Sequence, residues 1–399
     1  MSKNITSLLT IPSPINNLTG WPWTEEVPSN AYQDQSNWPR ISIVTPSYNQ
    51  GDYIEETIRS ILLQNYPNLQ YIIIDGKSTD NTIQIIEKYS PWIDYWVSEP
   101  DNGQSHAINK GIAICNGSWF NWINSDDCLK PFALFHLAKS LNVKTTQIIC
   151  GVTEQVQDSI MVNQFTVSGY TDLPKAFFSL GNNQQGSLLK ISDIRACNGI
   201  REDLDFCMDL DIWLKILLRH GYFCIDSIPQ HIAKYRYHSQ SKTCSTQDVF
   251  ALEEFSIITD IYEELSGSKV PNTLKYLRDQ CLAKRDKYES QKVYHQKDIS
   301  KAYFDRLLVN DSLLFRAIQR TNKLQTHSFP FFKKILDDLE PQIRDCYGHG
   351  FQKVIANAWL RAMQNKGSLY KTGILMTFKT LPFISTIKEL ARITVKGKR

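Results

Sequence analysis

Apolar runs and amphipathic stretches alternate along the chain between residues 41 and 123. Runs typical of buried strands occur at residues 41–45, 69–74, 95–97 and 119–123. Apolar residues recur at helical spacing over residues 54–62, 81–89 and 104–114. Pro46 is expected to end the first strand. Strands that alternate with helices predict an α/β fold, in which helices flank a mostly parallel sheet joined by right-handed crossovers.

Polar clusters follow three of the predicted strands. They are Ser47-Tyr48-Asn49, Asp75-Gly76 and Asn124-Ser125-Asp126-Asp127. Parallel sheets bind ligands at the carboxyl ends of their strands. We therefore expect the three clusters to meet along one edge of the sheet and to form a binding site there.

The regions before and after this segment differ from it in composition and in hydrophobic pattern. Residues 1–39 are rich in Pro, Asn, Ser and Trp without any period, which predicts an extended arm attached to the body by Trp21, Trp23 and Trp38. Residues 145–240 contain shorter, mixed elements, and beyond about residue 245 the pattern turns helical. The expected organisation is an arm over 1–39, an α/β domain over 40–245 and a mostly helical region over 246–399.

Composition indicates a globular chain of two or three domains, since 42% of the 399 residues are apolar and 21% are charged. The net charge of +3 is unevenly spread, because residues 330–399 hold 13 Lys and Arg against 5 Asp and Glu. A basic tail suggests contact with phosphates or with an anionic membrane surface, although a solvated helical face explains it equally well. Residues 369–393 would suit an amphipathic membrane-surface helix or packing on the α/β domain.

The nine cysteines are scattered without a CxxC pair, which predicts reduced thiols and a cytoplasmic protein. Residues 1–10 lack the features of a signal peptide, and no apolar stretch is long enough to span a membrane. We expect a cytoplasmic location, with peripheral contact to the inner membrane face as an option, and no nucleic-acid partner.

Two adjacent carboxylates, Asp126 and Asp127, follow an apolar strand and a preceding amide, Asn124. Such a set suits a hard cation such as Mg²⁺ or Mn²⁺, which would bridge the phosphates of a nucleotide. Capping of a following helix is the alternative. Asp75 could accept hydrogen bonds from a base or a ribose, or could satisfy its own turn. Tyr48 could stack on a base or could simply pack.

Three further residues could contribute chemistry. Asp209 or Asp211 could act as a general base, although capping of a helix start is the better-supported interpretation from the residues alone. His238 could fold back onto the carboxylates or be structural. Neither a Walker A loop nor a GxGxxG turn follows a strand, so phosphate loops of those kinds are excluded.

Four segments together resemble glycosyltransferase family 2, whose members are inverting enzymes with the GT-A fold. They are residues 44–51 (VTPSYNQG), 74–82 (IDGKSTDNT), 101–111 (DNGQSHAINKG) and 122–127 (WINSDD). The resemblance covers about residues 40–245 and implies a GT-A domain there.

The resemblance implies a nucleotide-sugar donor and a divalent metal, Mn²⁺ or Mg²⁺. Tyr48 and Asp75 would hold the base and ribose. The full donor-side set is Pro46, Tyr48, Asn49, Asp75, Lys110, Asn124, Ser125 and Asp126. Asn124-Ser125-Asp126 takes the place of the family's Asp-x-Asp motif, so Asp126 would bind the metal while Asn124 alters the ribose contact or the metal charge. His238 resembles the downstream metal-binding histidine.

On the acceptor side, Asp209 falls where the family places its base, but Met208 replaces the usual Glu and leaves the choice between Asp209 and Asp211 open. Gln185 and Gly186 resemble the loop that lines the acceptor site. His106 stands where many relatives have Asp, and its role stays open.

The implied activity is inverting transfer of a sugar, of the hexosyl type, to a saccharide or lipid-linked acceptor, in the synthesis of cell-surface polysaccharide or glycan. A catalytically silent module that binds nucleotide sugars is the alternative, favoured by Asn124 and Met208. Nucleotidyl transfer is disfavoured because residues 47–51 (SYNQG) carry no basic residue.

Overall fold

The computed structural model describes residues 7–14, 18–34, 37–167, 183–238, 250, 253–254 and 256–261. The described residues up to 238 belong to one compact unit, and those from 250 onward belong to a second. Residues 253–254 and 256–261 are helical, while the other helices expected beyond 261 and the basic tail lie outside the described residues. The boundaries at 39/40 and 245/246 therefore stay predictions. No helix of the described part is long and apolar enough to cross a membrane.

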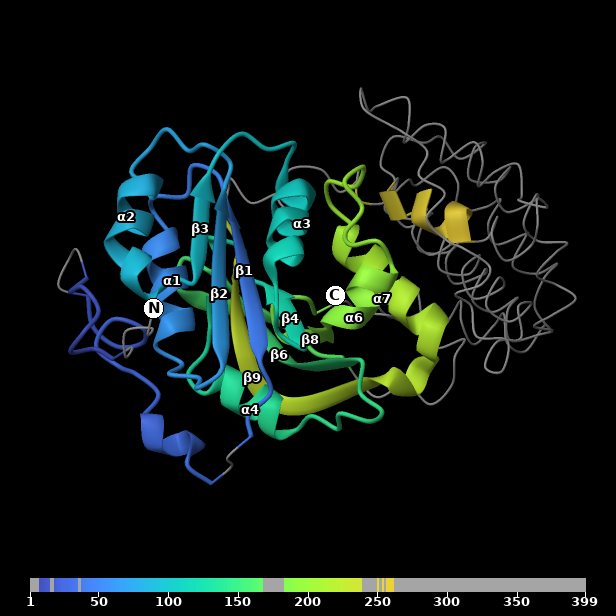
Figure 1. Cartoon of the computed structure of the whole chain (residues 1–399), viewed down its shortest axis with the longest axis horizontal. Coiled ribbons are helices and arrows are strands. Elements are labelled where there is room, and N and C mark those ends of the chain that lie inside the picture. The colour runs from blue at the N-terminus through green and yellow to red at the C-terminus, as the bar shows by residue number, and fades with distance from the viewer. Residues whose placement is uncertain are drawn as a thin grey trace, which may run out of the picture. The chain divides into compact units, whose positions relative to one another are not determined.

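Within the described residues, nine strands form one sheet in the order β3-β2-β1-β4-β8-β6-β9-β5, with β7 paired to β6 (Figure 1). The strands are β1 (Ile41–Ser47), β2 (Leu69–Asp75), β3 (Tyr95–Ser98), β4 (Trp119–Trp122), β5 (Cys128–Leu129), β6 (Ile148–Gln157), β7 (Ile160–Phe165), β8 (Ser187–Lys190) and β9 (Ile225–Arg236). The run from β3 to β4 is parallel, as is the pair of β6 and β9. Strands β5, β7 and β8 run antiparallel to their partners. The expected α/β sheet with flanking helices is confirmed.

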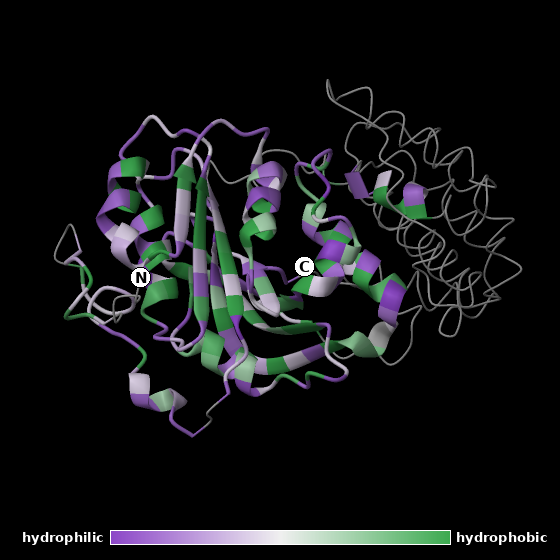
Figure 2. Cartoon of the chain, in the orientation of Figure 1, coloured by the Kyte–Doolittle hydropathy of each residue, from purple (hydrophilic) through white to green (hydrophobic). Residues whose placement is uncertain are grey.

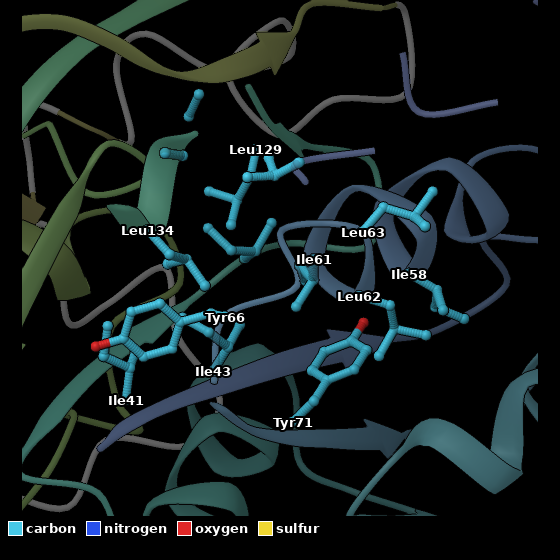
Figure 3. Packing of buried hydrophobic residues seen from close by; sticks show 14 of the residues in the cluster. Ile41, Ile43, Ile58, Ile61, Leu62, Leu63, Tyr66, Tyr71, Leu129 and Leu134 are labelled. Atoms are coloured by element: carbon cyan, nitrogen blue, oxygen red, sulfur yellow. The ribbon is translucent and has the colours of Figure 1, made fainter. Parts of the chain in front are cut away.

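Helices cover both faces of this sheet. They are α1 (Ile54–Leu62), α2 (Thr82–Tyr89), α3 (Gln104–Ile114), α4 (Ala133–Lys139), α6 (Ile191–Ala196) and α7 (Met208–His220), with short 3-10 turns at Ser29–Tyr32, Ser90–Trp92 and Tyr222–Cys224. Apolar residues gather along the central strands (Figure 2). Side chains of α1 such as Ile58 and Leu62 pack against Tyr71 and Ile43 of the sheet, together with residues of α2 and α4 (Figure 3). On the other face α3 lies against β1, where Gly111 meets Val44.

Pro46 does not end the first strand, contrary to expectation, because β1 runs on to Ser47. The carbonyl of Val44 accepts from Ile123 on the β4 side, and that of Ser47 accepts from Gly76 on the β2 side. Successive residues alternate between the two sides, so the position where Pro46 lacks an N–H faces β4. Because β4 pairs with β1 only as far as Val44, no ladder bond is lost there.

A buried arginine of α1 holds the N-terminal arm. Arg59 is 1% exposed and donates to the main-chain carbonyls of Pro12 (2.7 Å), Pro22 (3.0 Å) and Trp23 (2.8 Å). The indole of Trp21 donates to the carbonyl of Leu129 at 2.8 Å. The described part of the arm is thus fastened to the sheet domain mainly by Arg59, which the sequence did not single out, and by Trp21.

Candidate active site

The three polar clusters follow β1, β2 and β4, and the carboxyl ends of these strands stand side by side as predicted, because β1 lies between β2 and β4 and runs parallel to both. Ser47 pairs with Asp75, and Asp75 pairs with Ser98. The Asp75 carboxylate is fully buried and accepts hydrogen bonds from the Ser98 hydroxyl (2.6 Å) and from the amide and hydroxyl of Ser78 (2.9 and 2.5 Å). Asp75 therefore satisfies its own turn and ties β2 to β3. Its contact with a base or ribose stays a prediction.

Tyr48 follows β1 and leaves 60% of its surface exposed. A Cβ atom added to Gly76 would lie 3.3 Å from the Tyr48 ring and 2.8 Å from the carboxylate of Asp101, so the absence of a side chain at Gly76 leaves room for both. The next residue, Asn49, has a left-handed backbone (φ 52°), and its side-chain oxygen accepts from the Thr79 amide at 2.8 Å. An exposed ring on a braced loop suits stacking on a nucleobase.

Lys110 of α3 points to the loop after β3. Its ammonium pairs with Glu99 at 2.8 Å and donates to the carbonyl of Pro100 at 3.1 Å. His106, one turn earlier, accepts from the Asn102 amide at 3.0 Å through Nδ1. A contact of Lys110 with a diphosphate would require it to exchange these partners, and it stays a prediction.

The loop after β4 is fixed by polar contacts on both sides. The Asn124 side-chain oxygen accepts from Gln104 of α3 at 2.7 Å. The Thr57 hydroxyl of α1 lies 2.9 Å from the carbonyl of buried Ser125 and 2.7 Å from that of Asp127. The main chain of residues 124–127 is therefore held between α3 and α1.

The two aspartates of this loop have different surroundings. Asp126 faces His238, with 3.1 Å between its Oδ2 and the histidine Nε2. Asp127 is 1% exposed and accepts from the Arg236 amide (3.0 Å) and from Asn124 (3.2 Å). Burial, together with the neighbouring charge of Asp126, raises the pKa of the Asp127 carboxyl well above its usual range. Asp127 does not cap a helix, because β5 follows it.

Asp126 and His238 fit a divalent cation that is also held by a substrate. Carboxylate oxygen and imidazole nitrogen together suit Mn²⁺, and carboxylates suit Mg²⁺. No group of three or more His, Cys, Asp or Glu side chains within the described ranges could hold a metal by itself. Two protein ligands would leave coordination positions for phosphate oxygens and water, as in many sites where a metal binds with a nucleotide.

Asp209 and Asp211 lie in the first turn of α7, and their environments differ sharply. Asp209 is half-buried, and its carboxylate accepts from the adjacent Leu210 amide at 2.7 Å. Asp211 is fully buried, pairs with Lys215 at 2.7 Å and lies 3.7 Å from Arg201. Of the two carboxylates, only that of Asp209 is partly exposed to solvent.

Gln185 and Gly186 lead into β8 beside Gly151 of β6. The Gly186 carbonyl accepts from the Gly151 amide at 2.9 Å, and a Cβ atom on Gly186 would lie 2.6 Å from the Thr153 hydroxyl. The preceding Gln184 donates to the Asn121 side chain at 2.9 Å and also to the carbonyl of Trp122. The predicted acceptor loop is thus bonded to β4, the strand that leads to Asp126.

Comparison with known proteins decides the family. Residues 42–202 match the profile of glycosyl transferase family 2. The chain is 39% identical over 221 residues to the putative teichuronic acid biosynthesis glycosyltransferase TuaG of Bacillus subtilis, an alignment that covers 52% of this chain and 82% of TuaG. The chain belongs to glycosyl transferase family 2.

This family 2 glycosyltransferase is also 29% identical over 188 residues to the uncharacterized glycosyltransferase RT0329 of Rickettsia typhi, covering 45% of this chain and 59% of that protein. It therefore spans less than two thirds of that relative. Among solved structures it is similar to S. aureus TarS 1-349, with a TM-score of 0.54 at 17% identity over 84% of this chain and 90% of TarS 1-349. The same TarS fragment in complex with UDP gives a TM-score of 0.51 at 15% identity, with the same coverage. The expected GT-A fold is confirmed by these structures.

Sequence reasoning about this family 2 glycosyltransferase missed the residues that hold His238, the loop of residues 124–127 and the strand β4 before it. They are Tyr53, Glu56, Thr57, Gln184 and Arg236. Arg236 stands two residues before His238, and Tyr53 and Thr57 flank the start of α1. The polar run of residues 182–185 before Gly186 was the available signal for Gln184. For the others, no local pattern distinguished a site residue from an ordinary helix or strand residue.

Proposed function

We propose that this chain is an inverting, metal-dependent glycosyltransferase that moves a sugar, of the hexosyl type, from a nucleoside diphosphate donor to an acceptor hydroxyl. The observation that carries the proposal is the meeting of Asp126 and His238. These side chains are 112 residues apart in sequence and 3.1 Å apart in space, at the carboxyl edge of a GT-A sheet. Mn²⁺ or Mg²⁺ is the cofactor that this pair suits.

The relatives support the substrate class. TuaG is named for teichuronic acid biosynthesis, and TarS 1-349 has been solved with UDP. By analogy we assign this chain a uridine or related nucleoside diphosphate sugar as donor, and a saccharide or lipid-linked acceptor in cell-surface polysaccharide synthesis.

Each site residue then has a defined task. Tyr48 would stack on the base, while Asp126 and His238 would hold the cation. When bound, the cation would neutralise the negative charge that grows on the departing diphosphate. Asp209 would take the proton from the acceptor hydroxyl as its oxygen attacks the anomeric carbon from the side opposite the diphosphate, which inverts the configuration. Gln185 and Gly186 would line the acceptor side.

Asp209 is assigned as the base in preference to Asp211. A base must be within reach of the proton it removes. Asp211 has no exposed surface and is paired with Lys215, whereas Asp209 is half-buried and bonded to the next amide of its own helix.

A catalytically silent module is the second candidate, and the observation that favours it is Asn124. The side-chain amide of Asn124 forms hydrogen bonds with Gln104 and Asp127. It stands where a carboxylate could bind a metal or a ribose. Such a module would bind a nucleotide sugar without turning it over.

One set of measurements on the full chain tests both candidates. A panel of nucleotide sugars is screened by thermal shift with and without Mn²⁺, since a bound donor stabilises the folded state, and hydrolysis of the stabilising donor is then followed. We expect Mn²⁺-dependent hydrolysis that is lost in Asp126→Ala and retained in a control at exposed Asp34 (Asp34→Ala). Donor binding without hydrolysis would favour the silent module. Wild-type turnover in Asp126→Ala would refute the metal role.

The base is tested separately. Asp209→Asn should stop transfer to an acceptor and leave the thermal shift by donor unchanged. Loss of donor binding in this variant would show that Asp209 is not simply the base.

A further inference from the structure

Arg236, the last residue of β9, connects three separate parts of the candidate site. Its main-chain amide donates to the Asp127 carboxylate at 3.0 Å. One terminal guanidinium nitrogen, Nη1, donates to the main-chain carbonyl of Asp126 at 2.7 Å. The other, Nη2, donates to Glu56 of α1 at 2.7 Å. A single side chain thus joins β9 and α1 to the loop that carries Asp126.

Tyr53 extends this connection to His238. The guanidinium carbon of Arg236 lies 4.9 Å from the centre of the Tyr53 ring. The Tyr53 and His238 rings have their centres 4.9 Å apart and are inclined by 31°. The imidazole that faces Asp126 is therefore packed on a ring that Arg236 also contacts.

The guanidinium is already occupied within the protein. Both terminal nitrogens donate to protein oxygens, and the side chain is only 23% exposed. A phosphate-binding arginine would present this fork to its ligand. Arg236 presents it to the main chain of Asp126 and to Glu56 instead, so its contacts are those of a residue that holds others in place.

We propose that Arg236 is a positioning residue for the cation site: together with Glu56 and Tyr53, it fixes the main chain of Asp126 and the ring of His238 in the geometry that binds the metal. This inference rests on the proposed function, in which Asp126 and His238 are the metal ligands. Side chains that orient metal ligands typically change metal affinity by about 10- to 100-fold when they are removed.

The direction in which Mn²⁺ affinity changes when Arg236 is replaced distinguishes a positioning role from a purely electrostatic one. Removing a positive charge close to a cation site weakens repulsion, so Coulomb's law alone makes Arg236→Met bind Mn²⁺ more tightly. Loss of positioning makes the same variant bind Mn²⁺ more weakly. The direction of the change in affinity therefore decides between the two roles.

The test measures the dissociation constant of Mn²⁺ on the full chain in the presence of UDP, from the electron paramagnetic resonance signal of unbound Mn²⁺. Arg236→Met is compared with wild type and with Arg195→Met. The control removes an arginine of α6 whose guanidinium also donates to a main-chain carbonyl, that of Cys115 at 2.5 Å, and which touches no residue of the Asp126 loop in the described structure. Circular dichroism and the unfolding temperature are recorded for each variant.

We expect Arg236→Met to weaken Mn²⁺ binding by about 10- to 100-fold and Arg195→Met to leave it unchanged. Arg236→Lys should fall between, because lysine keeps the charge but cannot reach Asp126 and Glu56 with a planar fork. Affinity in Arg236→Met equal to or tighter than wild type overturns the proposal.

A second variant covers the case in which Arg236→Met fails to fold. Tyr53 is no partner in the hydrogen bonds of Arg236 named above, so Tyr53→Leu removes only the ring that contacts both Arg236 and His238. We expect Tyr53→Leu to bind Mn²⁺ several-fold more weakly than wild type. Unchanged affinity would overturn the proposal that Tyr53 orients His238.

Failure of this inference can be told apart from failure of the proposed function. If wild type binds no Mn²⁺ with UDP, or if Asp126→Ala binds it as well as wild type, the metal site itself is wrong. If binding depends on Asp126 but not on Arg236 or Tyr53, only the positioning role is wrong.

Discussion

Asp211 and Lys215 lie one helical turn apart on α7, and their side chains form an ion pair of 2.7 Å that is almost completely removed from water, with 0% and 4% of their surfaces exposed. Arg201, 3% exposed, lies 3.7 Å from the same carboxylate. A carboxylate so enclosed serves the stability of α7, whereas Asp209 on the same helix remains accessible for chemistry.

Substitution of Asp211 should therefore lower stability, whereas substitution of Asp209 should affect activity with little loss of stability. Asp211→Asn leaves the buried ammonium of Lys215 without its counter-charge, and we expect the free energy of unfolding to fall by about 3 kcal/mol or more. Asp209→Asn should lower it by only about 1 kcal/mol or less, because the side chain is partly hydrated and the asparagine oxygen can still accept from the Leu210 amide. Urea unfolding followed by tryptophan fluorescence measures both. Equal losses would contradict the assignment of Asp211 as structural.

The contact between Gly111 of α3 and Val44 of β1 leaves no space for a side chain. A Cβ atom on Gly111 would lie 2.5 and 2.6 Å from the two methyl carbons of Val44. Alanine normally favours a helix over glycine, but here we expect Gly111→Ala to destabilise the fold by about 1–3 kcal/mol through overpacking.

A double-mutant cycle checks the cause of that loss. In Gly111→Ala combined with Val44→Ala, the valine methyls are gone, and the total loss should be smaller than the sum of the two single losses. Strict additivity would show that the glycine is needed for another reason.

Removal of the Arg59 guanidinium should release the N-terminal arm. Arg59→Met loses the hydrogen bonds to Pro12, Pro22 and Trp23, and we expect the free energy of unfolding to fall by about 4 kcal/mol or more, since each of these three hydrogen bonds involves a charged group. Limited proteolysis should cut the arm sooner in this variant than in wild type or in the exposed-site control Arg195→Met. An arm that stays equally protected would contradict the role of Arg59.

The buried cysteines should resist thiol reagents. Burial raises the pKa of the Cys115 thiol to about 11 and that of Cys150 to about 12. At pH 8 both are protonated in the folded protein, and the reactive thiolate is scarce. Maleimide labelling mapped by mass spectrometry should modify neither residue in native protein and both in urea. Native labelling of Cys150 at the rate seen in urea would contradict the burial.

The edge of the sheet that carries the site could be predicted from the sequence because parallel strands expose their carboxyl ends together. Ser47, Asp75 and the loop of Asp126 follow from that rule alone. The surroundings of each side chain could not be predicted, since the Asp75 carboxylate is occupied by Ser98, 23 residues further on. Arg236 reaches Asp126 across 110 residues, and no local pattern marks such a partner.

The path of β1 through Pro46 shows the same limit. Proline is normally expected to end a strand because it has no N–H to donate. In β1 the position of the absent N–H faces β4 beyond the last residue that pairs with β4, so the strand continues. Which neighbour a strand has at each position is a property of the assembled sheet. The antiparallel strands β5 and β8 are likewise set by long-range pairing, whereas β7 forms a local hairpin with β6.

The attachment of the arm has a consequence for how the chain is made. The indole of Trp21 donates a hydrogen bond to the carbonyl of Leu129, which is synthesised 108 residues later. The carbonyl of Pro12 accepts from Arg59, which is synthesised 47 residues later. Residues 12–23 can therefore be secured only after α1 and β5 have been translated. During vectorial synthesis residues 12–23 therefore stay unattached until translation has reached Leu129, while the strands from β6 to β9 are made later still.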